Sequence, residues 1–251
     1  MLKKLKVLKS HGSQYIKNLQ TQPVSDLFRG RPAISGNISE KEISRVASIC
    51  PVDAIDKKSG SIDIGRCVFC KECAFMLPEK IRFTNDYRLA ANVRETLIIR
   101  PGVEIPVRLD ETKVRGEIRK LFSGALKLRE VSAGGDNSCE MELAASGNVN
   151  FDFGRYGIEF VASPRHADGI VITGPITENM EEALKICYDA IPLPKIIILA
   201  GTDAISGGIF DGSPALRRKF IEEHNIDLFV PGNPIHPLTY INGVMDLLGI
   251  K

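Results

Sequence analysis

The second half of the sequence predicts an α/β fold organised around a parallel β-sheet, and the first half predicts a small domain held by cysteine ligands. Two observations carry these predictions. From about residue 113 onward, short apolar segments alternate with stretches of helical periodicity, and four of the six cysteines lie between residues 50 and 73. Alternating strands and helices favour a parallel sheet with right-handed connections.

Residues 1–35 are predicted to form a basic N-terminal arm. Leu2, Leu5 and Leu8 recur at helical spacing among lysines, which is typical of a short amphipathic helix on a membrane surface or on a partner protein. A solvated, frayed terminus explains the same residues equally well. Both interpretations remain open.

Residues 36–90 form the cysteine-containing domain. A helix is predicted over 39–48, and short apolar segments at 62–64 and 81–83 flank the cysteines. Residues 91–112 follow with three strand-like segments, which prolines and a glycine interrupt. These interruptions by proline and glycine favour an extended linker over a core segment.

Residues 113–251 contain the α/β elements. We predict strands over 158–162, 169–173, 195–200 and 226–230, and helices over 178–190, 213–225 and 238–248. The strand segments are β-branched and apolar, as in strands that are buried on both faces. Ligand sites in such sheets lie beyond the carboxyl ends of the strands. The loops at 163–166, 201–203 and 231–233 are therefore candidate site segments.

Composition argues against several functional classes. A formal net charge of +2 is too small to indicate nucleic-acid binding. No apolar run reaches the ~20 residues of a transmembrane helix, and the first residues lack the apolar core of a signal peptide. We therefore expect a cytoplasmic protein with no transmembrane segment of its own. Its cysteines are then metal ligands rather than disulfides.

The most specific motif is the C-x2-C-x2-C run at Cys67, Cys70 and Cys73. Bacterial ferredoxins follow such a run with a fourth cysteine and a proline, and in two-cluster ferredoxins that fourth cysteine serves the other cluster. Cys50-Pro51 has the form of a fourth cysteine whose own run is missing. One complete ligand set therefore remains.

Cys50, Cys67, Cys70 and Cys73 together predict one [4Fe–4S] cluster. The positions where the ligands of a second cluster would stand hold Glu40, Ile43, Val46 and Leu77. Random decay would scatter the missing cysteines between both sites, so this pattern indicates selection for one working cluster. The alternative is a structural zinc site, although four-cysteine zinc sites usually use two C-x2-C pairs.

The first half resembles the two-cluster ferredoxin-like subunit of complex I and of membrane-bound [NiFe] hydrogenases of the formate hydrogenlyase type. The matching segments are 28–32, 50–55, 67–73 and 83–87. The second half resembles the small subunit of those group 4 hydrogenases and its complex I relative, the 20 kDa subunit. The segments that carry this resemblance are 157–168, 173–177, 192–195 and 230–232, with Pro234 and Pro237.

The chain thus resembles a fusion of two neighbouring subunits. This resemblance implies a bacterial-ferredoxin-like α+β domain followed by a flavodoxin-like parallel α/β sheet domain. It also implies partners, namely a hydrogenase-like or complex I-like large subunit and further subunits of a membrane-bound complex. Arg165 and His166 match the family at a strand end, where contact with the large subunit is expected; the alternative is that they cap their own loop.

In the small-subunit family, four cysteines hold a [4Fe–4S] cluster beside the active site of the large subunit. The resemblance aligns those positions with Asp136, Cys139, Asp203 and Asn233. Carboxylates and amides are poor ligands for such soft sites. We therefore expect this second cluster to be absent and the polar replacements to hydrogen-bond one another or water; the alternative is a new site for a hard metal ion.

Three other residues have simpler expectations. Cys139 and Cys187 are predicted to be small buried side chains. Glu142 matches an acidic family residue beside the cluster, for which a role in proton handling is the corresponding hypothesis.

We expect a non-catalytic iron–sulfur electron-transfer subunit of a membrane-associated oxidoreductase, bound peripherally on the inner face of the membrane. One alternative is a structural subunit whose cluster only stabilises the fold. Another is a free-standing, ferredoxin-like carrier. The absence of a second cluster would interrupt the family route for electrons, which keeps these alternatives open.

Overall fold

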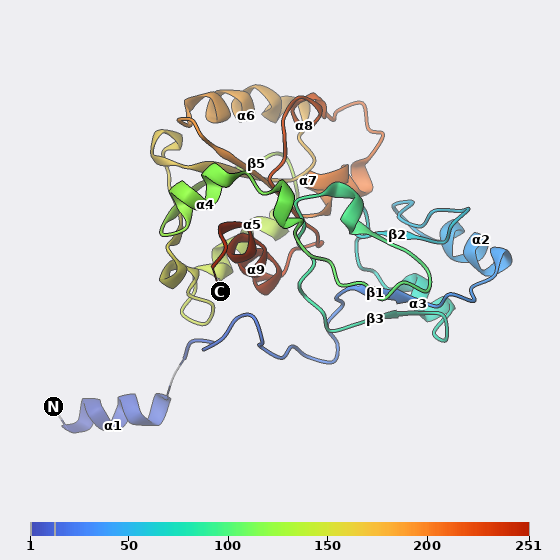
Figure 1. The fold of residues 1–251 in the computed structure, drawn as a ribbon, viewed down its shortest axis with the longest axis horizontal. Helices are drawn as coiled ribbons and strands as arrows, with labels where there is room; N and C mark the ends of the chain where they lie inside the picture. The colour runs from blue at the N-terminus through green and yellow to red at the C-terminus, as the bar shows by residue number, and fades with distance from the viewer. Residues whose placement is uncertain (1, 13, 251) are drawn as a thin grey trace.

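The computed structural model describes residues 2–12 and 14–250 and contains two parts that lie side by side (Figure 1). The larger part is built on a five-stranded sheet. Its strands are β5 (Leu126–Ser132), β6 (Ile158–Phe160), β7 (Gly169–Thr173), β8 (Ile196–Ala200) and β9 (Leu228–Val230).

All neighbouring strands in this sheet are parallel, in the spatial order β6-β5-β7-β8-β9. Numbered along the chain, this is the 2-1-3-4-5 order of the flavodoxin-like fold. Strands β7 and β8 are buried at every residue, as their largely apolar sequence predicts. The predicted α/β class is confirmed.

Helices cover both faces of the sheet. On one face lie α4 (Gly116–Phe122), α5 (Ser138–Ser146) and α9 (Pro237–Leu248), and on the other lie α6 (Glu178–Ala190), α7 (Thr202–Ser206) and α8 (Lys219–Glu223) (Figure 1). Alternate residues of a strand therefore enter different cores. Ile170 and Ile172 pack in the core that includes Leu184 of α6, while Val171 packs with Ile241 of α9.

The smaller part contains two antiparallel strand pairs. β1 (Pro32–Ile34) pairs with β3 (Ile81–Phe83), and β2 (Ile62–Asp63) pairs with β4 (Ile98–Ile99). Helix α2 (Glu40–Ser48) begins at the predicted place, because Ser39 and Glu42 form a reciprocal capping box. Helix α3 (Glu72–Met76) carries the last cysteine of the C-x2-C-x2-C run.

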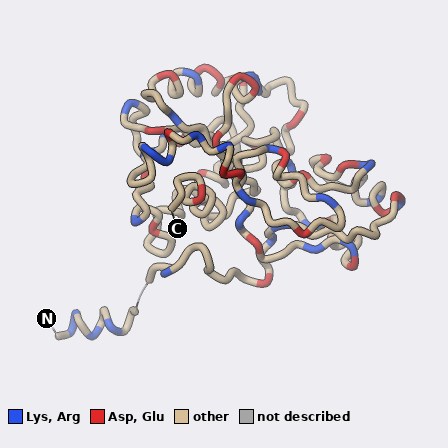
Figure 2. Tube along the Cα trace, in the orientation of Figure 1, with Lys and Arg blue, Asp and Glu red and all other residues tan. Residues whose placement is uncertain are grey.

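Helix α1 (Leu2–His11) has no buried residue, and its lysines lie along its whole length (Figure 2). Short 3-10 helices complete the fold: η1 (Arg94–Leu97), η2 (Glu111–Lys113), η3 (Phe153–Tyr156), η4 (Pro164–His166) and η5 (Gly208–Phe210). No helix among residues 2–12 and 14–250 has the length and apolar character needed to cross a bilayer.

Residues 91–112 pack against both parts. Leu97 is fully buried and Val107 is 2% exposed. Ala91 and Phe229 of β9 exchange two backbone hydrogen bonds, of 3.0 and 2.8 Å. The segment that the sequence predicted as an extended linker is thus a packed connection, because its apolar residues fill the junction between the two parts.

Candidate functional site

The four cysteines of the predicted cluster site line one cavity in the smaller part. Cys50 follows helix α2, Cys67 and Cys70 lie in the loop between β2 and α3, and Cys73 lies in α3. The rest of the wall is mostly apolar and includes Pro51, Val52, Ala54, Ile55, Ile62, Val68 and Phe83. Two segments separated in sequence thus bring the four sulfurs to one place.

The cysteine loop has a backbone that is unusual for its residue types. Phe69 and Lys71 adopt φ angles of 53° and 75°, in the left-handed region that non-glycine residues rarely occupy. Backbone amides face two of the sulfurs. The Phe69 amide donates to Cys67 Sγ at 3.3 Å, and the Ala54 amide donates to Cys50 Sγ at 3.2 Å. Such donors favour a thiolate over a thiol.

The surroundings of the cysteines oppose free thiolates. Burial raises the pKa of Cys67, and the neighbouring cysteines raise it further. Burial also raises the pKa of Cys73 to about 11, with Cys70 as the next cause. The thiols of Cys67 and Cys73 are therefore protonated at neutral pH unless a positively charged group binds and displaces the protons.

The chemistry of the donor set bears on the kind of metal group. Four cysteine thiols in a mostly apolar wall are surroundings that fit an iron–sulfur cluster. Structural zinc sites can also use four thiolates, usually from two C-x2-C pairs. The C-x2-C-x2-C run of Cys67, Cys70 and Cys73 follows the ferredoxin spacing instead.

Two side chains outside the cysteine segments hold this loop. Arg29 donates to the carbonyl oxygens of Phe69, at 2.9 Å, and Cys70, at 3.4 Å. Thr202, at the start of α7, donates its hydroxyl to the carbonyl oxygen of Cys67 at 3.0 Å. Sequence reasoning missed both residues, because neither has a ligand-type side chain or a diagnostic spacing.

The predicted second-cluster positions lie around the carboxyl end of the sheet. Asp203 and Asn233 meet, since Asn233 Nδ2 donates to Asp203 Oδ1 at 3.4 Å. Asp136 instead accepts from the backbone and hydroxyl of Ser138, at 3.0 and 2.6 Å. Cys139 packs so closely on Gly201 that a Cβ there would lie 2.5 Å from its sulfur.

Negative charge accumulates at these second-cluster positions. Burial raises the pKa of Asp203 to about 6, and the carboxylates of Asp136 and Glu140 add to the effect. Burial raises the pKa of Cys139 to about 12. An anionic iron–sulfur cluster would be poorly accommodated beside these carboxylates.

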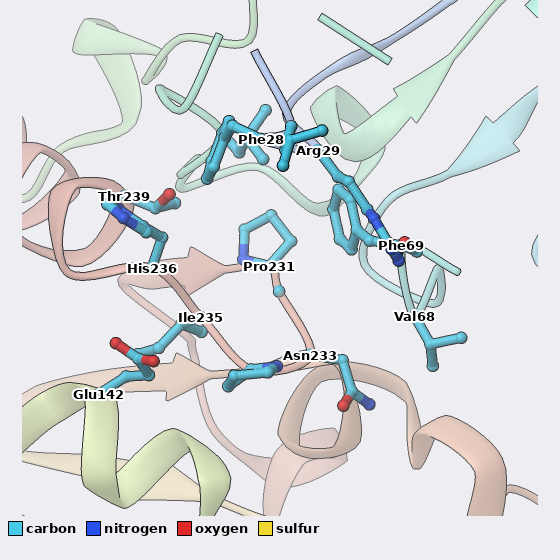
Figure 3. Close-up of a pocket in the computed structure, with 14 residues that line it drawn as sticks. Phe28, Arg29, Val68, Phe69, Glu142, Pro231, Asn233, Ile235, His236 and Thr239 are labelled. Carbon is cyan, nitrogen blue, oxygen red and sulfur yellow. Dashed lines mark hydrogen bonds between the residues drawn. The ribbon is translucent and has the colours of Figure 1, made fainter. Parts of the chain in front are cut away.

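A larger cavity of about 310 Å³ is lined by residues of the cysteine loop and of the loop that follows β9 (Figure 3). Phe28, Arg29, Phe69, Glu142 and His236 all line it, and the rings of Phe28 and His236 meet edge to face with their centroids 5.2 Å apart. Burial raises the pKa of Glu142 and lowers that of His236. His236 also caps α9, since its Nδ1 accepts from the Leu238 amide at 3.1 Å.

The remaining predicted residues are peripheral to both cavities. Arg165 and His166 are exposed in η4, immediately after β6. Cys187 is half-buried in α6 and packs against the core.

Comparison with known proteins decides the family. The family described as "NADH ubiquinone oxidoreductase, 20 Kd subunit" matches residues 137–247, which is most of the α/β part. A Pyrococcus furiosus protein named "Probable membrane-bound hydrogenase subunit mbhJ" is 36% identical over 115 residues, and the match covers 46% of this chain and 69% of that protein. The chain belongs to this family.

Two further relatives are similar to this chain at comparable levels of identity. An NADH-quinone oxidoreductase subunit of Geotalea daltonii is 39% identical over 43% of this chain and 64% of its own length. The formate hydrogenlyase subunit 7 of Escherichia coli K12 is 32% identical over 59% of each chain. The chain thus spans 59–69% of the length of these three relatives. The family match begins at residue 137, after the cysteine loop.

Proposed function

We propose that this chain is an iron–sulfur electron-transfer subunit of a hydrogenase-related or complex I-like oxidoreductase, with one [4Fe–4S] cluster on Cys50, Cys67, Cys70 and Cys73. The observation that carries the proposal is the cavity lined by all four cysteines, with backbone amides directed at two of the sulfurs. When bound, such a cluster accepts and releases one electron at a time. The protein supplies the four ligands, the amide donors and a largely apolar wall.

The names of the relatives support the proposal that this chain is a subunit of a larger oxidoreductase complex. They are subunits of a membrane-bound hydrogenase, a formate hydrogenlyase and an NADH-quinone oxidoreductase. We infer that the α/β part binds a related large subunit, with exposed Arg165 and His166 at the contact. We also infer a peripheral position on the cytoplasmic face of a membrane.

We further infer that the first part, residues 36–90, is a ferredoxin-like domain, with residues 1–35 as an arm, 91–112 as a connection and 113–251 as the α/β domain. The antiparallel strand pairs and the cysteine loop support the ferredoxin likeness. The carboxylates at the second-cluster positions support the loss of the cluster of the α/β domain.

The rival function is a structural subunit whose cluster only stabilises the fold. The acidic second-cluster positions favour this rival. If the α/β part holds no cluster, electrons have no second iron–sulfur centre through which to pass from the first cluster to a large subunit. The two functions differ in whether the cluster is reversibly reduced.

The test is anaerobic purification or reconstitution of the full chain, followed by iron and acid-labile sulfide analysis and a redox titration monitored by electron paramagnetic resonance. We expect about four iron and four sulfide per chain and a reversible one-electron signal. Stoichiometric zinc without sulfide would overturn the cluster assignment. A bound cluster that does not titrate reversibly would favour the structural rival.

A further inference from the structure

The cysteine loop is held from both sides by residues of other segments. Arg29 comes from the N-terminal arm, and Thr202 comes from the α/β part. Both donate to carbonyl oxygens of the loop, to Phe69 and Cys67 respectively. These contacts join segments that are 40 and 135 residues apart in the sequence.

A held carbonyl fixes the direction of the amide in the same peptide unit. The described cis bonds lie only at Leu193-Pro194 and Asn233-Pro234, so the loop peptides are trans. In a trans peptide the C=O and N–H bonds point in opposite directions within one plane. Arg29 therefore orients the amide of Cys70, and Thr202 orients the amide of Val68.

The loop lies between two cavities. Arg29, Val68 and Phe69 line the larger cavity on the outer side of the loop (Figure 3). Cys67, Val68 and Cys70 line the cysteine cavity on the inner side. The Phe69 carbonyl faces Arg29 on the outer side, so the Cys70 amide is turned away from Arg29. The Cys67 carbonyl faces Thr202, so the Val68 amide is turned away from α7.

The Thr202 contact is the more enclosed of the two. Thr202 has no exposed surface, and its hydroxyl is shared between the carbonyl oxygens of Cys67, at 3.0 Å, and Gly232, at 3.1 Å. Gly232 precedes Asn233, one of the second-cluster positions. The hydroxyl therefore connects the cysteine loop directly to the loop after β9.

We propose that Arg29 and Thr202 are positioning residues that set the reduction potential of the front cluster by aiming the Cys70 and Val68 amides at it. This inference rests on the proposed cluster. Amide donors and a nearby cation stabilise the reduced, more negative cluster more than the oxidised one. Loss of either residue therefore lowers the reduction potential.

The test measures the midpoint potential of the full chain and of three variants. Arg29→Gln removes the charge at an exposed position, so it leaves the fold intact. Thr202→Val removes the hydroxyl and keeps the branched shape. Ser206→Ala is the matched control, because Ser206 also carries a hydroxyl on α7 but donates to the Thr202 carbonyl oxygen, at 3.0 Å, and not to the cysteine loop.

Iron and sulfide are measured first in every protein. At a fixed potential, we expect the ratio of reduced to oxidised cluster to fall about threefold to tenfold in Arg29→Gln and in Thr202→Val, where tenfold corresponds to about 59 mV for one electron. Ser206→Ala should match the unmodified chain. If Thr202→Val loses its cluster, Arg29→Gln still decides the inference.

The possible outcomes distinguish a failure of the proposed role of Arg29 and Thr202 from a failure of the proposed cluster. Loaded variants with unchanged potentials would overturn the role of Arg29 and Thr202 and leave the proposed function standing. An unmodified chain without iron and sulfide would overturn the proposed function itself.

Discussion

The four cluster cysteines line one cavity, which neither Cys139 nor Cys187 lines. Two of the four, Cys50 and Cys67, also accept backbone amide hydrogen bonds there. We therefore expect Cys67→Ser to abolish the cluster, because a serine hydroxyl is a poor ligand for these soft sites.

Cys187→Ser and Cys139→Ser are the controls for that substitution, and both should retain full iron and sulfide content. The measurement is metal analysis with the visible absorption of the cluster. A Cys139→Ser protein without its cluster would show that Cys139 had been misassigned.

Asp203 gives the chain a specific dependence on pH. Its pKa is raised from 3.8 to about 6, so the folded state binds a proton more tightly than the unfolded state. The stabilisation from that proton is complete below about pH 4 and is lost as the pH rises through 6.

We expect Asp203→Asn to raise the free energy of unfolding at pH 7. The upper bound is about 3 kcal/mol, and allowance for solvent screening reduces it to about 1 kcal/mol. The advantage should vanish near pH 4. Urea unfolding of both proteins at pH 4 and pH 7 measures it, and equal differences at the two pH values would contradict the explanation.

At the scale of elements, helix α2 depends on its first turn. The Ser39 side chain accepts from the Glu42 amide, and the Glu42 carboxylate accepts from the Ser39 backbone amide. The helix presents Ile43, Val46 and Ala47 to the core, and its last turn leads to Cys50. Ser39→Ala should destabilise the protein by about 1 kcal/mol.

Ser48→Ala is the control for the cap, because Ser48 donates only to the Arg45 carbonyl oxygen at 2.8 Å, near the end of the same helix. Denaturant unfolding should leave it close to the unmodified chain. An equal loss in the two variants would argue against the capping box.

Sequence patterns correctly predicted those strands and helices whose apolar residues are the ones that the fold buries. Strands β7 and β8 are apolar except for Thr173 at the end of β7, and α6 has the predicted bounds. Strand β5 was missed although it lies inside the sheet, because charged residues alternate along it. Lys127 at its start is exposed and pairs with Glu159 at 3.4 Å, so the charge is tolerated there.

Other differences also have local causes. The predicted helix over 213–225 is reduced to α8, because residues 211–217 form turns, with a bridge between Leu216 and Thr177. The spacing of the cysteines alone predicted the set that lines one cavity. The roles of Arg29 and Thr202 could not be predicted from the sequence, because they depend on which carbonyl groups the folded chain places beside these side chains.

At the scale of the whole molecule, the second-cluster positions come from the three segments that follow β5, β8 and β9, at the carboxyl end of one sheet. The surrounding fold is that of the family to which the chain belongs, so the missing thiols are the main obstacle to a second cluster. We expect Asp136→Cys, Asp203→Cys and Asn233→Cys together, with Cys139 retained, to raise the iron content from about four to about eight per chain.

The pair Asp136→Cys with Asp203→Cys is the control for that triple variant, because it leaves Asn233 in place and supplies only three thiols. It should gain no complete [4Fe–4S] cluster. Iron and sulfide analysis with electron paramagnetic resonance distinguishes the two proteins, and an unchanged iron content in a folded triple variant would show that the pocket itself has closed.

The backbone pairing of Ala91 with Phe229 has a further consequence for any attempt to divide the chain. β9 is the last strand of the sheet, and an uncovered outermost strand offers unpaired amides and carbonyls to other molecules. A fragment that starts at residue 113 would lack Ala91 and leave that border bare. We expect it to self-associate in light scattering, while the full chain stays dispersed, because in the full chain Ala91 pairs with Phe229. Residues 91–112 then protect the outermost strand of the sheet from aggregation.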